Sequence, residues 1–228
     1  MKTEDYIILI PARKNSKRLI GKNKRLLMGK PLIAHSIEYA LKFFPENQIW
    51  VNTDDIQIKK ITMDYNINFY NRKAELAEDE TTTNAVVKDF CEYMVSMKFK
   101  FKNIITLQPT NPIRSSSLMT ESIEKFEKLR GNSLMSVSVL HKKFGSIRDN
   151  RYIPINYKIG QRHQDLEDQY FENGQIYISS QYSILNLNNY ISEDVIPHIT
   201  DEIGSNIDID YESDFNLAEV IMKNQKFL

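Results

Sequence analysis

The chain has 228 residues, 41% of them hydrophobic and 11% aromatic, which is enough to bury the core of one large domain. Thirty basic residues balance thirty acidic ones, so the chain is not a polycation that coats nucleic acid. Cys91 is the single cysteine, which excludes an internal disulfide, and the four histidines lack metal-ligand spacing. No apolar run approaches the roughly 20 residues that cross a bilayer, so we expect a cytoplasmic protein without a membrane partner.

Short apolar runs alternate with amphipathic helical patterns along the chain. The pattern predicts strands at 7–10, 48–53, 67–70, 103–108, 133–140, 174–179 and 206–210. It predicts helices at 31–44, 55–65, 82–97, 116–129 and 214–225. This alternation favours an α/β fold with a mostly parallel sheet flanked by helices. Near-continuous apolar strands such as "YIILI" and "NIITL" suit a sheet that is covered on both faces.

Residues 141–172 interrupt this pattern with a polar stretch that has no sustained period. The stretch is too long for a simple loop inside a compact domain, so it is either a functional excursion or an oligomer contact. The chain has no internal repeat and no low-complexity linker. We therefore interpret 1–228 as a single domain with one inserted protrusion at 141–172.

Seven cationic side chains follow the first predicted strand, between Arg13 and Arg25. In open α/β sheets ligands bind beyond the carboxyl ends of the strands, so this basic loop should face a ligand. It contains neither a G-x-G-x-x-G pattern nor a P-loop pattern, and phosphates would be held by side chains and backbone N–H groups. Considered alone, such a loop is more often a solvated lysine-rich surface.

A pair of carboxylates, Asp208 and Asp210, lies two residues apart on one face of the strand predicted at 206–210. Ile207 and Ile209 alternate with them on the other face. An exposed strand tolerates both charges in water, but elsewhere they repel unless a cation lies between them. Mg²⁺ prefers one or two carboxylates together with phosphate oxygens. The acid pair and the basic loop therefore suggest nucleotidyl transfer from a magnesium-bound triphosphate.

Five segments resemble motifs of the acylneuraminate cytidylyltransferases, the CMP-sialic acid synthetases. They read "PARKNSKRLIGKN", "RKAELA", "LQPTNPIR", "ENGQIYI" and "IDID…D…AE", occur in the family's order and extend over nearly the whole chain. The resemblance implies a Rossmann-like nucleotidyltransferase domain whose protrusion, 141–172, mediates homodimerisation and contributes to the sugar site. It also implies that CTP and a nine-carbon 2-keto sugar acid (a nonulosonic acid) give the CMP-sugar and diphosphate, with Mg²⁺ as cofactor.

The resemblance implies a role for individual residues. Lys22 would stabilise charge on the α-phosphate, and Asp208 and Asp210 would hold Mg²⁺. One of the two, by preference Asp208, would also take the proton from the sugar's anomeric hydroxyl. The nucleotide would be bound by Arg13, Asn15, Ser16, Lys17, Asn23, Arg72, Thr83 and Gln108. Arg162 or Gln164 would bind the carboxylate of the sugar acid.

The chain departs from the family's pattern at several motif positions. Arg18 stands where many members have glycine, Lys73 replaces a proline, Asn111 a serine and Gln175 an alanine, and His163 stands where arginine is common. The nucleotide half therefore matches the family more closely than the sugar half does.

Three alternatives are compatible with the sequence. The same chemistry could act on legionaminic acid, on another nonulosonic acid or on Kdo (3-deoxy-D-manno-octulosonic acid). The second alternative is a nucleotide-binding scaffold without activity. The intact residues Lys22, Asp208 and Asp210 argue against it. A nucleic-acid-binding module is the third, and the lack of aromatic residues interleaved with the charges of 13–25 argues against it.

Overall fold

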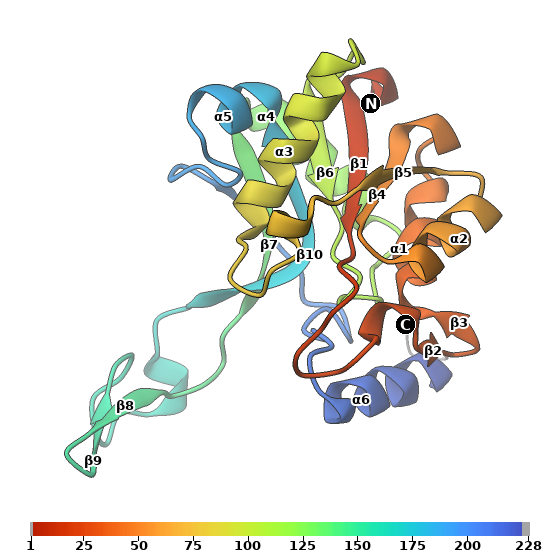
Figure 1. The fold of residues 1–228 in the computed structure, drawn as a ribbon. Coiled ribbons are helices and arrows are strands. Elements are labelled where there is room, and N and C mark those ends of the chain that lie inside the picture. The colour runs from red at the N-terminus through yellow and green to blue at the C-terminus, as the bar shows by residue number, and fades with distance from the viewer. Residues whose placement is uncertain (1, 225–228) are drawn as a thin grey trace.

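The computed structural model describes residues 2–224, which form a layered α/β fold around one large sheet (Figure 1). This sheet has seven strands in the order β11-β7-β10-β6-β1-β4-β5. Its strands are β1 (Tyr6–Pro11), β4 (Ile49–Thr53), β5 (Asn68–Asn71), β6 (Asn103–Thr106), β7 (Ser133–Val139), β10 (Tyr170–Ser180) and β11 (Ile196–Ile199). β10 runs antiparallel to β6 and β7, and the other pairings are parallel. The mostly parallel sheet predicted from the sequence is confirmed.

Helices cover both faces of the sheet (Figure 1). They are α1 (Leu32–Leu41), α2 (Ile56–Asp64), α3 (Thr83–Ser96), α4 (Leu118–Leu129), α5 (Gln181–Asn186) and α6 (Glu212–Lys223). α2 begins after Asp55, whose side chain accepts a hydrogen bond from the main chain of Gln57 at 2.8 Å. α3 begins after Thr82, which accepts from the main chain of Ala85 at 3.3 Å. Both residues satisfy amide groups that a helix start leaves free.

The side chains of β1 are divided between the two sides of the sheet. Ile8 and Ile10 pack in a cluster with α1, α2 and α4, whereas Ile7 and Leu9 pack with α3 and α5. All four side chains are fully buried. The continuous apolar run in the sequence therefore reflects a strand that is covered on both faces. None of the helices within residues 2–224 combines the length and the apolar character that crossing a bilayer requires.

The strand expected at 206–210 is not formed, and this prediction was wrong. The segment is extended, and Ile207 and Ile209 pack against Leu27 and Phe215 in a cluster beside α6. The amide of Ile209 donates to the carbonyl of Thr110 at 2.8 Å, but no ladder of such bonds joins the segment to the sheet among the described residues. The alternation of polar and apolar residues indicates which side chains are buried, but it does not determine whether the segment pairs with another strand.

Other boundaries differ more modestly from the prediction. α6 begins at Glu212, two residues earlier than expected, and Gln225, the last residue expected in this helix, lies outside the described residues. β11, α5 and a short hairpin of β2 (Leu26–Leu27) and β3 (Lys30–Pro31) were not predicted. These elements are short, and short apolar segments carry little periodicity.

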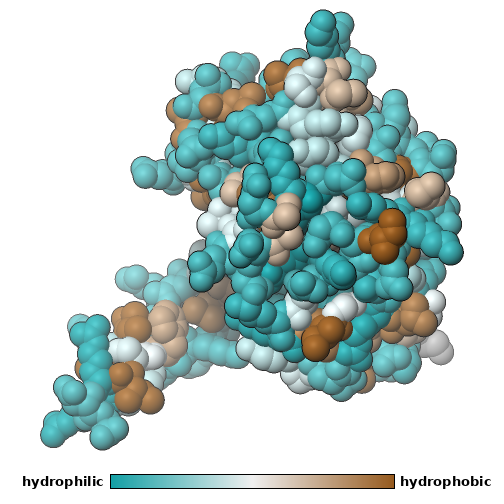
Figure 2. All heavy atoms as spheres, in the orientation of Figure 1, coloured by the Kyte–Doolittle hydropathy of each residue, from teal (hydrophilic) through white to brown (hydrophobic). Residues whose placement is uncertain are grey.

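The segment 141–172 forms an arm that projects from the body of the molecule (Figure 1). Its outer part is an antiparallel hairpin of β8 (Gly145–Arg148) and β9 (Arg151–Pro154), where the sequence had indicated only irregular structure. Figure 2 shows hydrophobic residues on the arm beside hydrophilic ones. The exposed large apolar residues of this segment are Phe144, Ile147, Tyr152, Ile153, Ile155, Ile159 and Tyr170.

Candidate active site

A cavity of about 440 Å³ opens where β1 and β6 end at their carboxyl sides. The loop after β1 supplies one wall, the segment between β5 and α3 a second, and the loop after β6 a third. Nine of the residues expected to bind substrate or metal line it: Arg13, Ser16, Lys17, Lys22, Asn23, Arg72, Thr83, Gln108 and Asp210. The structure thus brings together most of the site inferred from the motifs.

Four expected site residues do not line this cavity. Asn15 is exposed on the basic loop, and Asp208 is exposed beside Asp210. Arg162 and Gln164 lie on the arm, where Arg162 pairs with Asp165 at 2.8 Å. Within one chain, the two residues expected to bind the sugar are therefore separated from the nucleotide-binding residues.

Lys22 and Asp210 form the centre of the site. The Nζ atom of Lys22 donates to the carbonyl of Ile209 at 2.6 Å and to Oδ1 of Asp210 at 2.9 Å. Lys22 lies in a short 3₁₀ helix (Lys22–Lys24) that starts after Gly21. The φ angle of Gly21 is 65°, a left-handed conformation that glycine adopts without steric cost. This turn directs the lysine inward, and only 8% of its surface is exposed.

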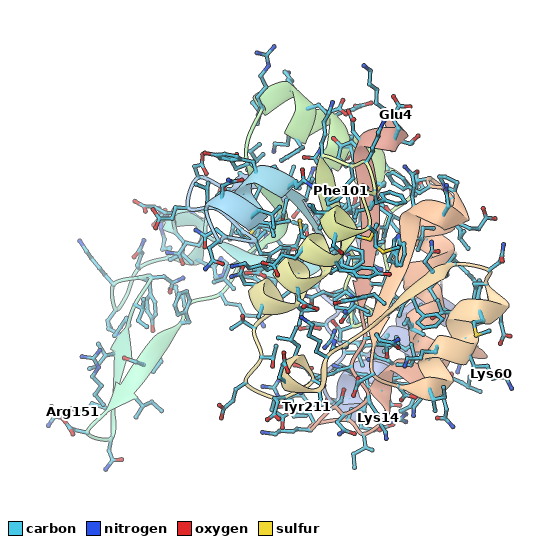
Figure 3. All side chains as sticks on the ribbon, turned by 45° about the horizontal axis from the view of Figure 1, so that its top comes forward. Glu4, Lys14, Lys60, Phe101, Arg151 and Tyr211 are labelled. Carbon is cyan, nitrogen blue, oxygen red and sulfur yellow. The ribbon has the colours of Figure 1, made fainter. Side chains whose placement is uncertain are left out.

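The carboxylate of Asp210 contacts two cations. Arg18 donates to Oδ2 while Lys22 contacts Oδ1, and the Arg18 guanidinium also lies 5.5 Å from the ring centre of Tyr211. Partial burial by itself would raise the pKa of Asp210, but the hydrogen bond and charge of Lys22, together with Arg18, hold this pKa below its usual range. Figure 3 shows Lys14, from the same basic loop as Arg18, at the same end of the molecule as Tyr211.

Asp208 has a different environment from Asp210. Its side chain reaches solvent, but the surrounding protein removes part of its hydration, and this loss raises its pKa above the usual value. The negative charge of Asp210 acts in the same direction, and the nearby Thr110 hydroxyl acts against it. A carboxylate with a raised pKa is better suited to accept a proton than one held in a tight ion pair.

The acid pair fits a magnesium ion by its donor chemistry. Ile207 and Ile209 are buried on one side of the extended segment, which leaves Asp208 and Asp210 on the other. No group of three potential metal-ligating side chains occurs within residues 2–224, so phosphate oxygens and water would complete the coordination. Arg18 would have to release Asp210 to give such an ion access to Oδ2, because Lys22 contacts Oδ1.

Asp79, which the motifs did not single out, holds two residues of the basic loop. Its Oδ1 lies 2.6 Å from Nη1 of Arg13, and its Oδ2 lies 2.8 Å from Nζ of Lys17. These contacts, first with Lys17 and then with Arg13, lower the pKa of Asp79. The acid-rich run "AEDE" that follows Arg72 was the only signal in the sequence.

Arg72 is held by a second residue that the motifs did not reveal. Its Nε donates to Oδ1 of Asn52 at 2.5 Å, and Asn52 is fully buried at the end of β4. Burial lowers the pKa of Arg72 to about 10, and the charge of Asp54 partly opposes this shift. Among the described residues, Arg72 has only neutral hydrogen-bond acceptors, and it has lost part of its hydration. Its charge is therefore available to bind an anionic or carbonyl group.

The loop after β6 is fixed around Gln108. Arg114 donates to the carbonyl of Gln108 at 2.7 Å and to that of Gln175 at 2.8 Å. Asn111 donates to the carbonyl of Ile207 at 2.9 Å, and this bond connects the loop to the segment that carries the acid pair. Gly174 has a φ of 77°, and a Cβ there would lie 2.8 Å from Oδ1 of Asn111. Asn111, one of the departures from the family's pattern, thus has a structural use in this chain.

Fold and site together define a nucleotidyltransferase: a mostly parallel sheet carries a basic loop and an acid pair at its carboxyl edge. The family model described as cytidylyltransferase matches residues 7–226, and the chain belongs to this family.

Individual proteins agree with this assignment. The chain is 35% identical over 232 residues to the CMP-N,N'-diacetyllegionaminic acid synthase of Legionella pneumophila, covering 97% of this chain and 98% of that protein. It is 31% identical over 217 residues to the N-acylneuraminate cytidylyltransferase of Streptococcus agalactiae, covering 92% of this chain. The match covers only 51% of that enzyme, so this chain spans about half its length.

A solved structure with a similar fold is that of CMP:2-keto-3-deoxy-manno-octonic acid synthetase complexed with CTP. The TM-score is 0.71 and the sequence identity 16%, and the match covers 96% of this chain and 99% of that one. At this identity the likeness concerns the fold alone.

Proposed function

We propose that this protein transfers CMP from CTP to a 2-keto nonulosonic acid of the sialic type and releases diphosphate. The observation that carries the proposal is the cavity, which places the cations Arg13, Lys17, Lys22 and Arg72 around a space bounded by Asp210. A triphosphate needs such a concentration of cations, and a triphosphate with Mg²⁺ also needs carboxylates. Membership of the cytidylyltransferase family supports CTP as the nucleotide.

In this mechanism the chain binds and orients the two reactants. Arg13, Lys17 and Lys22 neutralise the phosphates, while Asp208 accepts the proton of the anomeric hydroxyl. The freed oxygen then forms a bond to the α-phosphorus as the bond to diphosphate breaks. Asp208 and Asp210 would hold Mg²⁺, which supplies further neutralisation of phosphate charge when bound. The barrier falls because the groups are positioned in advance and the developing charge meets fixed cations.

The remaining expected nucleotide ligands surround this reaction centre. Arg72, Thr83 and Gln108 line the part of the cavity beyond the basic loop, where they would bind the nucleoside. Asn23 donates to the carbonyl of Arg13 at 3.2 Å and keeps the loop folded over the cavity.

N-acylneuraminate is the acid expected from the motifs, and a di-N-acetylated legionaminic acid is the second candidate. The second candidate is favoured by one observation: the legionaminic acid synthase matches this chain over 98% of its own length, whereas the N-acylneuraminate enzyme extends far beyond the match.

The arm would contribute to the function by pairing two copies of the chain. Arg162 and Gln164 are exposed on the arm and do not line the cavity of their own chain. In a homodimer built on 141–172 they would be available to the partner's sugar. The exposed apolar residues of the arm support such a contact, because they would be buried by it.

The decisive experiment measures diphosphate release for each of CTP, UTP, ATP and GTP with N-acetylneuraminate, a di-N-acetylated legionaminic acid and Kdo. We expect release with CTP and Mg²⁺ to exceed that with the other nucleotides by orders of magnitude, and to require a nonulosonic acid. Equal release with ATP would contradict the nucleotide assignment. Binding of CTP without release for any acid would favour the scaffold alternative.

A further inference from the structure

Two carboxylates hold four cations of the basic loop. Asp79 contacts Arg13 and Lys17, and Asp210 contacts Lys22 and Arg18. In each case one carboxylate oxygen faces one cation. A phosphate group presents its oxygens to cations in the same way. The carboxylates are therefore bonded to the cations for which the phosphates of a nucleotide bound in the cavity would compete.

The Asp79 contacts are of a kind that a ligand can displace. The side chains of Asp79 and Lys17 are 34% and 71% exposed, and that of Arg13 is 29% exposed. Exposed pairs of this type contribute little to stability, because water solvates the separated charges well. A triphosphate carries more charge than one carboxylate, so it would win the competition for both cations.

If Asp79 and a phosphate both contacted these cations, their negative charges would repel each other. Asp79 lines the same cavity as Arg13 and Lys17, and a triphosphate bound there would bring like charges into proximity with its carboxylate. Asp79 comes from the segment between a 3₁₀ helix (Ala74–Leu76) and α3, which is joined to the basic loop through these side chains. Nucleotide binding would therefore separate this segment from the loop, and loss of the phosphates would bring the two together again.

We propose that Asp79 is a phosphate surrogate: it competes with the triphosphate and with diphosphate for Arg13 and Lys17, and thereby limits the affinity of the cavity for both. This inference rests on the proposed function in taking the nucleotide's phosphates as the ligands of the basic loop. It deepens that function by assigning Asp79 a role in diphosphate release. The carboxylate returns to the two cations as the product leaves, so release does not expose them unpaired.

A simpler role would give the opposite result. If Asp79 only holds Arg13 and Lys17 in the orientation that binds phosphate, its removal would weaken phosphate binding. If it is a competitor, its removal strengthens binding. The sign of the change in affinity separates the two roles.

The test measures the affinity for inorganic diphosphate by isothermal titration calorimetry in Asp79→Asn and in the wild-type protein. We expect the dissociation constant to fall about three- to tenfold in Asp79→Asn, because two exposed ion pairs no longer compete with the ligand. The Michaelis constant for CTP should fall in parallel, and product inhibition by diphosphate should become stronger, while kcat changes less.

Two variants serve as controls. Asp79→Glu keeps the charge and should resemble the wild-type protein. Asp64→Asn removes one charge from an exposed aspartate at the end of α2, outside the cavity lining, and should leave diphosphate affinity unchanged. Because Asp79 is partly exposed in a loop, folding should survive its replacement, and Asp79→Ser provides a second variant if Asp79→Asn is unstable.

Weaker or unchanged diphosphate binding in Asp79→Asn, or in Asp79→Ser if that variant replaces it, would overturn the surrogate role, as would a wild-type protein that does not bind diphosphate. A wild-type protein that binds diphosphate but does not turn over CTP would contradict the proposed function. If Asp79→Asn still bound diphosphate more tightly in that case, the surrogate role would stand.

Discussion

The Nζ atom of Lys22 lies 2.9 Å from Oδ1 of Asp210, although 188 positions separate the two residues in the sequence. This contact joins the basic loop after the first strand to the acid pair near the other end of the chain. Lys22 is almost wholly buried, so the carboxylate of Asp210 compensates a charge that water no longer solvates. The contact therefore links the stability of the loop to the site that is proposed to hold the metal.

The first prediction concerns the two carboxylates, which should both be needed for turnover. Asp208→Asn and Asp210→Asn keep size and hydrogen bonding but remove one charge. Turnover should fall at least about a hundredfold in each, the scale of losing one preorganised charge-stabilising group. Steady-state diphosphate release with CTP and Mg²⁺ checks this, and near-normal turnover in both variants would defeat the metal assignment.

The same two variants should differ in stability without Mg²⁺. Asp208→Asn should hold or raise the melting temperature, because it removes a charge that partial loss of hydration and the charge of Asp210 both disfavour. Asp210→Asn should lower stability by about 1–3 kcal/mol, because it takes the charged partner from the buried ammonium of Lys22. Thermal or denaturant unfolding of both variants measures the contrast, and equal stabilities would speak against the different environments of the two acids.

The basic loop, Arg72 and Gln108 could be predicted from the sequence because each belongs to a motif with a recognisable order. Asn52 and Asp79 could not, since an amide near a strand end and an acid in a loop have no pattern of their own. They acquire a role only through Arg72, Arg13 and Lys17. Their importance depends on contacts between distant parts of the chain.

In the fold, likewise, features that depend on local spacing could be predicted, whereas features that depend on distant segments could not. The alternation of Ile207 and Ile209 correctly indicated which side chains are buried, since burial follows from local spacing. Pairing in a sheet depends on a neighbouring strand, which the sequence does not specify, so the strand at 206–210 was predicted wrongly. Likewise, the hairpin at 145–154 was not predicted, because its strands pair with each other rather than with a covered sheet. Its two-residue turn, Asp149 and Asn150 with φ angles of 49° and 60°, was a local signal.

The second prediction concerns Asn52, which should act through Arg72. Asn52→Ala removes the acceptor at 2.5 Å from Nε of Arg72, and the guanidinium should lose its fixed orientation. We expect the Michaelis constant for CTP to rise about three- to tenfold, the scale of one hydrogen bond to a charged group, with a smaller change in kcat. Asn71→Ala, on an exposed asparagine of β5, is the matched control and should resemble the wild-type protein. A fall in kcat alone would contradict a binding role.

The third prediction follows from His35, whose pKa burial lowers below the usual value. Lys30 and Arg114 act in the same direction, while the hydrogen bond to the carbonyl of Leu27 at 3.0 Å and the charge of Glu38 oppose it. The unfolded chain therefore binds more protons than the folded one just below the ordinary value of about 6.5. The stabilising contribution of His35 is complete above that pH and is lost as the pH falls towards the folded-state pKa.

Melting temperatures between pH 7.5 and 5 check this prediction. The wild-type protein should lose stability as the pH falls, and His35→Gln should lose less over the same interval. His141→Gln replaces an exposed histidine on the arm and should follow the wild-type profile. Parallel profiles for wild type and His35→Gln would show that His35 does not contribute to the acid sensitivity.

The last prediction concerns assembly through the arm. Ile147 is 77% exposed and Ile159 is 76% exposed, and burying such side chains against a second copy would stabilise a dimer. The wild-type protein should sediment as a dimer, and Ile147→Asp combined with Ile159→Asp should shift it towards monomer. Ile56→Asp is the matched control, because Ile56 is 76% exposed but lies on α2 in the body of the molecule, where a charge should leave the assembly intact. Sedimentation velocity over a range of concentrations measures all three, and a wild-type monomer at every concentration would refute the proposed dimer.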